Sequence, residues 1–303
     1  MHVFHIYKKG SLPFPAQQFH TPNVRVLRAE YWIMDLWNHE NLSAPYWRLY
    51  WNPDRGAWVE LHGHRWPLDP AHLVLIPPRT PFRSRLERSR DHQPGANVMR
   101  GHPYQSDSTH RSTAARPSGA VRHFFVHFTA GFPCDHGAPH VFSFPVDHRG
   151  RMLLRTLTSR LKIDQAQFNH RQTFKLQELI HHALEKVPES YWPHPPDDAR
   201  VLRVMQHIDA NYGMPLRNGD FASMAGMNPN AFVRLYKEKT QLTPLDYLRT
   251  RRIEKASILL LQTDRTIEDI AACCGFFDRN HFSRIFQKHS GFGPATYRRS
   301  RRQ

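Results

Sequence analysis

The C-terminal part of the chain contains an internal repeat with a spacing of about 50 residues. Ala222 and Gly226 recur as Ala271 and Gly275, one residue closer than the rest of the repeat. The aromatic, proline and arginine positions keep the full spacing: Phe232, Arg234, Tyr236, Pro244, Tyr247 and Arg249 recur as Phe282, Arg284, Phe286, Pro294, Tyr297 and Arg299. Two copies are too few for a solenoid, so the sequence predicts a paired module.

The first copy has the pattern of two short helices joined by a glycine turn. Phe221, Met224 and Ala225 lie at positions i, i+3 and i+4, which form one face of a helix. Gly226 can end this helix, because glycine tolerates the left-handed backbone that a helix end often needs. Asn228 is a candidate N-cap for the second helix, which has proline at its first position.

The second copy repeats this pattern. Ile267, Ile270 and Ala271 form the apolar face, Gly275 ends the helix, and Asp278 can cap the next one. In both copies the second helix has a polar and basic outer face. A helix pair of this kind is the architecture that places a recognition helix in the DNA major groove. A lone match would be weak, because amphipathic helix pairs are common, but a tandem match is much more specific.

The string GFFDRNHFSRIFQKHSGFGPATYRR at residues 275–299 closely resembles the AraC/XylS (arabinose-regulator) family of bacterial transcription factors. The resemblance covers about residues 198–299. It implies two helix-turn-helix units joined by a long helix at residues 244–261. One departure is Gln241, where the family usually has glycine, which affects the local turn more than recognition.

The resemblance also implies which side chains face DNA. Asn230, Val233 and Arg234 correspond to base-facing positions of the first recognition helix. Arg279, Asn280 and Arg284 correspond to those of the second. The expected DNA-binding set also includes outer-face neighbours, and is Asn230, Val233, Arg234, Lys237, Arg279, Asn280, Ser283 and Arg284. Arginine can clamp the edge of guanine and asparagine that of adenine, whereas valine can only touch a thymine methyl group.

The net charge of the chain favours a polyanionic partner. Lys and Arg number 42 against 26 Asp and Glu, a formal net charge of +16. Only +7 of this charge falls on residues 197–303, so the charge supports contact with nucleic acid without locating it. A basic chain can also be merely soluble and adhesive.

The N-terminal part has the signals of a β-barrel or sandwich. Short apolar or aromatic runs separated by turn-rich pieces begin near Val24, Trp32, Trp47, Trp58, Leu73 and Val121. In the last run Phe124, Val126 and Phe128 alternate with His123, Phe125 and His127. Residues 66–82 resemble the cupin-type strand-turn-strand of the sensor domain in the same family. We therefore expect an α+β multidomain chain with a cupin-like barrel, a helical pair and an all-α tandem helix-turn-helix domain.

The expected domain organisation follows the composition along the chain. Residues 1–20 read as an N-terminal arm, and residues 21–148 as the ligand-sensing barrel. Within the barrel, residues 86–120 lack apolar signal and read as a mobile insertion. Residues 149–187 predict two helices that either dimerise or only cover the barrel. The proline-rich residues 188–197 predict a semi-stiff linker before the DNA-binding domain at residues 198–303.

The barrel offers aromatic residues that could stack on a small effector such as a sugar. Candidate ligand-binding residues are Tyr46, Trp47, Trp58 and Trp66, within a wider set that includes Tyr50 and Trp51. Since strand residues alternate between faces, only about half of these can point inward. Core packing alone would explain them equally well.

The histidines and cysteines give little support to metal binding or catalysis. His62 and His64 flank a glycine and indicate a hairpin turn, because a cupin-type metal set lacks its carboxylate at the required spacing. Cys273 and Cys274 read as small buried residues rather than a redox switch, and Cys134 stands alone. The three cysteines form no disulfide framework, and no signal peptide or membrane span is evident, so a bacterial cytoplasm is expected.

These observations predict a sequence-specific transcription regulator controlled by a small molecule, without cofactor or metal. Its expected partners are double-stranded DNA and an effector, with RNA polymerase and a second copy of the chain as further candidates. Two alternatives stay open: a cupin-type metal-dependent enzyme with an appended nucleic-acid-binding domain, and a DNA-binding regulator that needs no ligand.

Overall fold

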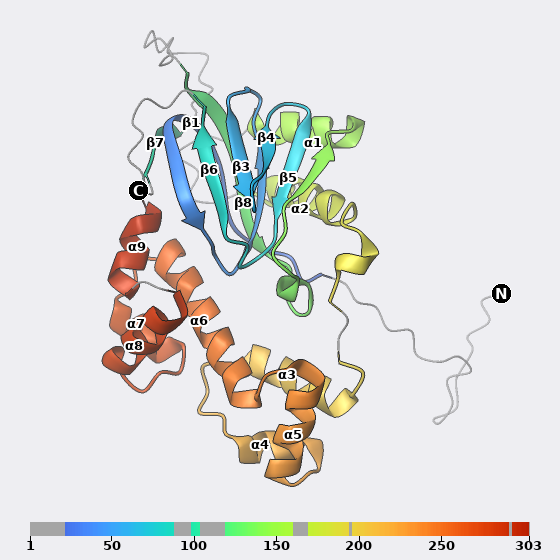
Figure 1. Cartoon of the computed structure of the whole chain (residues 1–303), viewed down its shortest axis with the longest axis vertical. Coiled ribbons are helices and arrows are strands. Elements are labelled where there is room, and N and C mark those ends of the chain that lie inside the picture. Colours follow the sequence, from blue (N-terminus) through green and yellow to red (C-terminus); the bar gives the residue numbers. More distant parts are fainter. Residues whose placement is uncertain are drawn as a thin grey trace, which may run out of the picture.

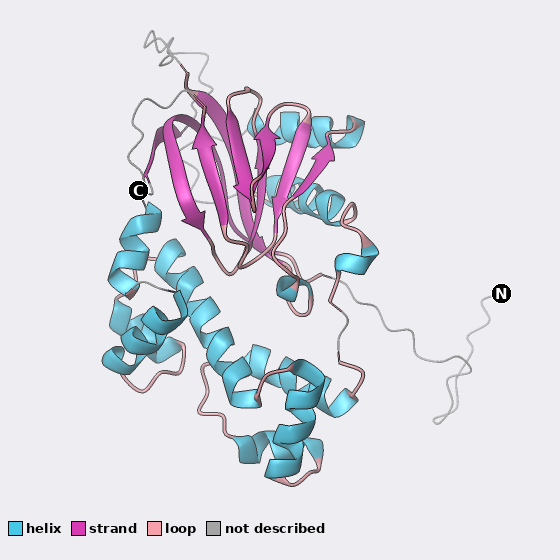
Figure 2. Cartoon of the chain, in the orientation of Figure 1, coloured by secondary structure: helices cyan, strands magenta, loops and turns pink. Residues whose placement is uncertain are grey.

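A computed structural model describes residues 22–87, 98–103, 119–159, 169–193, 196–290 and 293–302. In these residues the chain forms a nearly closed antiparallel β-barrel, two helices packed on the barrel, and an all-helical C-terminal region (Figures 1 and 2). This confirms the predicted fold class. The arm expected at residues 1–20 lies outside the described residues.

The barrel is one antiparallel sheet. Its strands are β1 (Arg25–Leu42), β2 (Trp47–Trp51), β3 (Ala57–Leu61), β4 (His64–Leu68), β5 (His72–Ile76), β6 (Phe82–Leu86), β7 (Val98–Pro103), β8 (Val121–Thr129) and β9 (Phe142–Pro145). They are ordered β4-β3-β6-β1-β8-β2-β5-β9, and β7 pairs with β1. Strand β7 lies within the stretch 86–120, which the sequence analysis read as an insertion without structure; residues 88–97 and 104–118 lie outside the described part.

The two faces of the sheet build two separate cores. On β8, Phe124 and Val126 face helices α1 (His148–Thr158) and α2 (His170–Leu184), whereas Phe125 faces the barrel interior, as the alternation in the sequence predicted. His123, also buried, lies next to Phe125 in the interior. The helices on one face and the interior on the other therefore leave β8 buried on both sides.

Helices α1 and α2 use their apolar stripes to cover the barrel. Leu153, Leu157, Leu179 and Ile180 are buried in the same core as the outer face of the sheet. Residues 160–168, within the stretch expected to form the two helices, lie outside the described residues. The apolar sides of α1 and α2 pack against the barrel, as expected if these helices cover it. Dimerisation through this helical pair stays a prediction.

The segment after α2 is anchored rather than free. A 3-10 turn (Glu189–Tyr191) places Tyr191 and Trp192 against Trp47, with ring centroids 6.3 and 5.9 Å away. The hydroxyl of Tyr191 donates to the carbonyl of Ala138 at 2.7 Å. The first part of the stretch expected to be a linker is thus tied to the barrel by its aromatic side chains.

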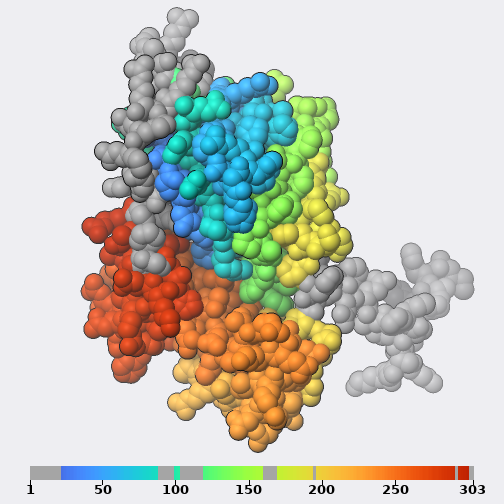
Figure 3. All heavy atoms as spheres, in the orientation of Figure 1, coloured from blue at the N-terminus to red at the C-terminus, as the bar shows by residue number. Residues whose placement is uncertain are grey.

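The C-terminal region consists of α3 (Ala199–Asn211), α4 (Asn218–Ala225), α5 (Pro229–Thr240), α6 (Pro244–Gln262), α7 (Ile267–Cys273), α8 (Arg279–Ser290) and α9 (Pro294–Arg302). Figure 1 shows α6 running beneath the barrel, with α3–α5 at one end and α7–α9 at the other. In Figure 3 these helical units lie directly against the barrel surface.

Three smaller expectations can be compared with the structure. His62 and Gly63 have φ values of 51° and 82° and form the turn between β3 and β4, as predicted. Cys274 is buried, as predicted. The prediction was wrong for Cys273, which is exposed because it lies on the solvent-facing side of α7. In the described part of the chain, no helix is long and apolar enough to cross a membrane.

Candidate nucleic-acid interface and barrel cavity

Helices α4 and α5 form the first helix-turn-helix unit. Gly226 ends α4 with a φ of 61°, in the left-handed region that favours glycine. The side chain of Asn228 accepts a hydrogen bond from the backbone N–H of Asn230 at 3.0 Å and so caps α5. Phe221 and Phe232 are fully buried between the helices. The turn, the cap and the buried positions agree with the sequence pattern.

Helices α7 and α8 form the second unit in the same way. Gly275 follows α7 with a φ of 75°. Asp278 accepts a hydrogen bond from the backbone N–H of His281 at 2.7 Å and caps α8. Ile270 and Phe282 are fully buried in the core of this unit.

Two turns of these units have distinct backbone requirements. A Cβ added at Gly275 would lie 2.8 Å from the carbonyl oxygen of Gly213 and 2.8 Å from Nη2 of Arg252, so only glycine fits. A Cβ at Gly226 would meet no atom within 4 Å. Gln241 ends α5 with a φ of 62°, which is the conformation that glycine usually provides at this position of the family.

The structure places the predicted DNA-facing side chains on the outer faces of α5 and α8. Val233 and Ser283 are half-buried at their edges, which leaves little of either side chain for a base. The exposed members are Asn230, Arg234 and Lys237 on α5, and Arg279, Asn280 and Arg284 on α8.

The basic side chains of these faces carry uncompensated charge. In the described residues no carboxylate forms an ion pair with Arg234, Lys237, Arg279 or Arg284. By contrast, Lys239 on the inner side of α5 pairs with Asp197 at 3.0 Å. An exposed cation without an acidic neighbour is available to a phosphate or to the acceptor edge of a base.

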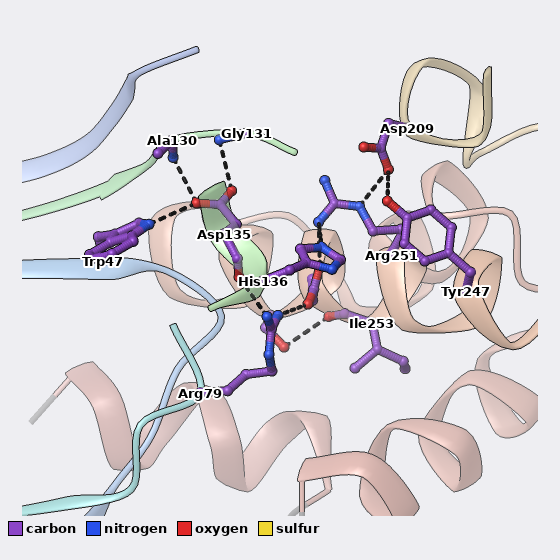
Figure 4. Close-up of polar contacts among 12 residues, drawn as sticks. Trp47, Arg79, Ala130, Gly131, Asp135, His136, Asp209, Tyr247, Arg251 and Ile253 are labelled. Carbon is purple, nitrogen blue, oxygen red and sulfur yellow. Dashed lines mark hydrogen bonds and ion pairs between the residues drawn. The ribbon is translucent and has the colours of Figure 1, made fainter. Parts of the chain in front are cut away.

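Helix α6 fixes the first unit through a buried polar network. The guanidinium of Arg251 donates from Nε to Asp209 of α3 at 2.7 Å and from Nη1 to Glu254 at 2.6 Å. The hydroxyl of Tyr247 donates to the same carboxylate of Asp209 at 3.1 Å (Figure 4). Arg252 donates to the carbonyl of Tyr212 at 2.7 Å, which ties α6 to the segment after α3 as well.

The same network reaches the barrel. Arg79, in the turn after β5, forms an ion pair with Glu254 and donates to the carbonyl of Asp135 at 2.5 Å (Figure 4). Burial alone would raise the pKa of Glu254, but the charges of Arg251 and Arg79 hold this pKa below its usual value. Apolar contacts add to the link, since Tyr46 is buried in one core with Leu260 of α6.

A cavity opens between the barrel interior and the end of α6. Its volume is about 70 Å³. Strands β1, β2, β7 and β8 supply most of the wall, and Leu261 and Gln262 of α6 complete it. The lining residues are Arg28, Trp37, His39, Leu42, Tyr46, Arg48, Tyr50, Met99, His123, Phe125, His127, Leu261 and Gln262.

The cavity takes in one of the four predicted ligand-binding residues. Tyr46 lines it, and Tyr50 of the wider aromatic set does so too. Trp47 faces the opposite side of β2, where its Nε1 donates to Asp135 at 3.0 Å. Trp58 does not line the cavity, and the Cζ atom of Arg65 lies 4.3 Å from the centroid of its ring. Trp66 does not line the cavity either and belongs to β4, the first strand in the sheet order.

Several residues of both sites are not marked by any sequence pattern. Arg48, which lines the cavity, is an isolated polar residue in the apolar strand β2, and only the alternation of the strand could have pointed to it. His39, which also lines the cavity, lies in a polar run at residues 38–41 that does not distinguish it from its neighbours. Phe277, directly before the cap of α8, is 93 % exposed and adds an apolar ring beside the second recognition helix. The string at residues 275–299 contained this residue, but no periodicity marked it as exposed.

Comparisons with known proteins agree with this geometry. Residues 221–300 match the family described as "Helix-turn-helix domain". The HTH-type transcriptional activator RhaS of Enterobacter sp. (strain 638) is 33 % identical over 105 residues, which are 35 % of this chain and 38 % of RhaS. The arabinose operon regulatory protein of Escherichia coli (strain K12) is 31 % identical over 126 residues, 41 % of this chain and 42 % of that protein. The chain therefore spans about two fifths of the length of these curated relatives.

A solved structure extends the likeness in fold to the barrel. ToxT from Vibrio cholerae aligns with 91 % of this chain and 98 % of its own, with a TM-score of 0.50 and 11 % identity. At this identity the likeness concerns the fold alone. The curated relatives are named as a transcriptional activator and an operon regulatory protein. The C-terminal helix-turn-helix domain of the chain is therefore similar to the DNA-binding domains of AraC/XylS-type transcriptional regulators.

Proposed function

We propose that the chain is a ligand-responsive regulator whose two helix-turn-helix units read neighbouring major grooves on one face of DNA. One observation carries this proposal: Arg234 and Arg284, equivalent in the internal repeat, are both exposed on the second helix of their unit. The continuous helix α6 joins the two units. Successive major grooves on one face lie about 34 Å apart, so a fixed connection favours simultaneous contact.

The proposed division of roles follows the chemistry of the side chains. Arg234 and Arg284 make bidentate contacts with bases, worth about 1–3 kcal/mol each. Asn230, Arg279 and Asn280 lie near the helix starts and make further base or phosphate contacts, and Lys237 neutralises a phosphate. Val233 and Ser283, half-buried, contribute at most a contact with a methyl group or phosphate.

Control by a small molecule is supported by the place of the cavity. Its wall joins barrel residues such as Tyr46 to Leu261 and Gln262, the last two residues of α6. A ligand shifts DNA occupancy only if it binds two arrangements of the protein with different affinity. A molecule that contacts barrel and helix together can make that distinction.

The protein partners, the cellular location and the domain boundaries stay predictions. A second copy of the chain and RNA polymerase are expected partners from the family resemblance. The bacterial cytoplasm is the expected location, since the matched regulators are bacterial proteins. The domain divisions at residues 148, 187 and 197 are proposals too, supported by the positions of α1, α2 and α3.

The test is competition binding to the DNA that flanks the gene of this protein, titrated in salt. Arg234→Ala and Arg284→Ala are compared with wild type and with Arg203→Ala, an exposed arginine of α3 outside both recognition helices. We expect each recognition-helix variant to lose about 5- to 150-fold in affinity for the preferred site. Weak binding that depends on salt should persist.

Two results would contradict the proposal. If all four proteins prefer the same site equally, the two arginines do not read bases. If no flanking fragment is preferred over competitor DNA and the binding of all four depends only on salt, the net charge alone accounts for the interaction. Stoichiometric metal in the purified protein would instead revive the enzyme alternative.

A further inference from the structure

Arg48 is a buried cation without a counter-ion. Only 1 % of this residue is exposed, and its Nη1 atom is buried without a hydrogen-bond partner. The guanidinium lies over the rings of Tyr46 and Phe82, 4.9 and 5.2 Å from their centroids. No carboxylate among the described residues pairs with it. A charge in this position has a high desolvation cost unless an anion joins it.

The cavity beside Arg48 contains cations but no acid. Its lining includes Arg28 and Arg48, and neither aspartate nor glutamate. Arg28 is already compensated, because its Nε donates to Glu30 at 2.5 Å. The two arginines of the cavity lining therefore differ: Arg28 has a carboxylate partner inside the protein, whereas Arg48 is buried in the cavity wall without one.

We propose that the cavity binds a small carboxylate molecule through the guanidinium of Arg48. The planar fork of arginine matches the two oxygens of a carboxylate and forms charge-assisted hydrogen bonds with it. Stacking on Tyr46 and Phe82 holds the guanidinium plane in place, so little conformational freedom is lost on binding. The inference rests on the proposed ligand control and names the chemical class of the ligand.

The size and walls of the cavity restrict this ligand further. The cavity of about 70 Å³ is roughly half the size of a cavity of about 150 Å³ that holds benzene, so only a short molecule fits it. Trp37, Tyr50 and Phe125 form aromatic walls for a short apolar body. The imidazole of His123 adds no positive charge to the cavity at neutral pH, because burial lowers its pKa to about 3. A singly charged carboxylate with a short hydrocarbon part fits this set.

Butyrate and butyramide make a matched pair of probes, since each has six heavy atoms and only butyrate is charged. We expect butyrate to raise the melting temperature of the full-length protein by at least about 2–4 °C near saturation, and butyramide to leave it unchanged. By calorimetry, Arg48→Met should weaken the binding of butyrate at least tenfold. Arg100→Met is the control, because Arg100 is exposed on β7 and pairs with Asp35 outside the cavity.

Arg48→Met also tests the proposal without any ligand. An unpaired buried charge destabilises the folded protein, so its replacement by an unbranched apolar side chain should leave the melting temperature equal or higher. A melting temperature below those of wild type and Arg100→Met would mean that the protein itself satisfies Arg48, and would overturn the proposal. Methionine keeps an unbranched apolar chain in place of the aliphatic stem of arginine, which limits the loss of packing.

The remaining outcomes separate the ligand classes. Equal shifts with butyrate and butyramide, or no shift with propionate and butyrate, would overturn the carboxylate assignment. A larger shift with inorganic phosphate than with butyrate would do the same and point to a phosphate ester. These measurements contain no DNA, so their failure leaves the DNA-binding proposal intact, whereas loss of site preference in the DNA test leaves this one intact.

Discussion

Arg79 of the barrel forms an ion pair with Glu254 of α6, and Glu254 is bound at the same time by Arg251 of its own helix. Arg251 in turn binds Asp209 of α3. The barrel, the helix between the two DNA-binding units and α3, which packs against the first of these units, are thus joined by one chain of charges. The two arginines have unequal roles in this chain, because Arg251 is buried and Arg79 is partly exposed.

Replacing Arg251 should destabilise the protein far more than replacing Arg79. Arg251→Met leaves Asp209 and Glu254 without the cation between them, and breaking a buried pair costs about 3–5 kcal/mol. Arg79→Met leaves Glu254 paired with Arg251 and should cost about 1 kcal/mol or less. Urea unfolding of both variants measures the two losses. Equal losses would mean that the barrel contact, rather than Arg251, stabilises the network.

The two turn glycines provide a matched comparison of backbone and packing effects. Gly226→Ala should cost about 1–2 kcal/mol, because only the left-handed backbone is penalised where the added Cβ meets open space. Gly275→Ala has the same backbone penalty and also pushes against Gly213 and Arg252, which adds about 1–3 kcal/mol. Thermal or urea unfolding gives both values. A smaller loss at Gly275 than at Gly226 would contradict the close approach of α6 and the turn.

His123 should make the protein sensitive to mild acid. Burial lowers its pKa to about 3 in the folded state, whereas the unfolded chain binds a proton near pH 6.5. A depressed folded pKa gives stability that is present above pH 6.5 and is lost as the pH falls toward 3. Between pH 7.5 and pH 5, this group should reduce the unfolding free energy by about 2 kcal/mol.

His123→Gln isolates that contribution. Glutamine can keep a hydrogen bond to Asn52, which His123 contacts at 2.7 Å, but it does not titrate. The variant should lose about 2 kcal/mol less than wild type between these pH values, measured as the difference in urea midpoints. His148→Gln, at an exposed position of α1, should behave as wild type. If wild type and His123→Gln lose the same stability, another group is responsible.

The recognition units could be predicted from sequence because their determinants are local. Gly226, Asn228 and Asp278 act within one turn of their own helix, and the repeat at a spacing of 50 residues doubles the signal. The alternation of the side chains on β8 is local too, because successive residues of a strand point to opposite faces. Where all determinants of an element lie within a few neighbouring residues, pattern and structure agree.

The cavity and the barrel contact depend on distant parts of the chain. Tyr46 and Trp47 are neighbours, and only the packing of Trp47 in the core under α1 and α2 shows that Tyr46, rather than Trp47, lines the cavity. Arg79 and Glu254 are separated by 175 residues, and no local pattern links them. Strand β7 was missed because Gly101 and its polar neighbours have little strand signal, and pairing with β1 stabilises them instead.

The spacing of the two half-sites should matter as much as their sequence. Since α6 is one continuous helix packed on both units, the recognition helices α5 and α8 hold a fixed separation. We expect an operator with five added base pairs between its half-sites to bind about 10- to 100-fold more weakly. This insertion rotates one half-site by about half a turn and moves it away from α8.

The variants make this expectation specific. On the lengthened operator Arg284→Ala should have almost no further effect, because α8 no longer reaches its bases, while Arg234→Ala should still weaken binding. Ten added base pairs restore the face of the DNA but exceed the reach of α6, so affinity should not recover. Recovery at ten base pairs, or an undiminished effect of Arg284→Ala at five, would mean that the two units move independently and that α6 does not fix their spacing.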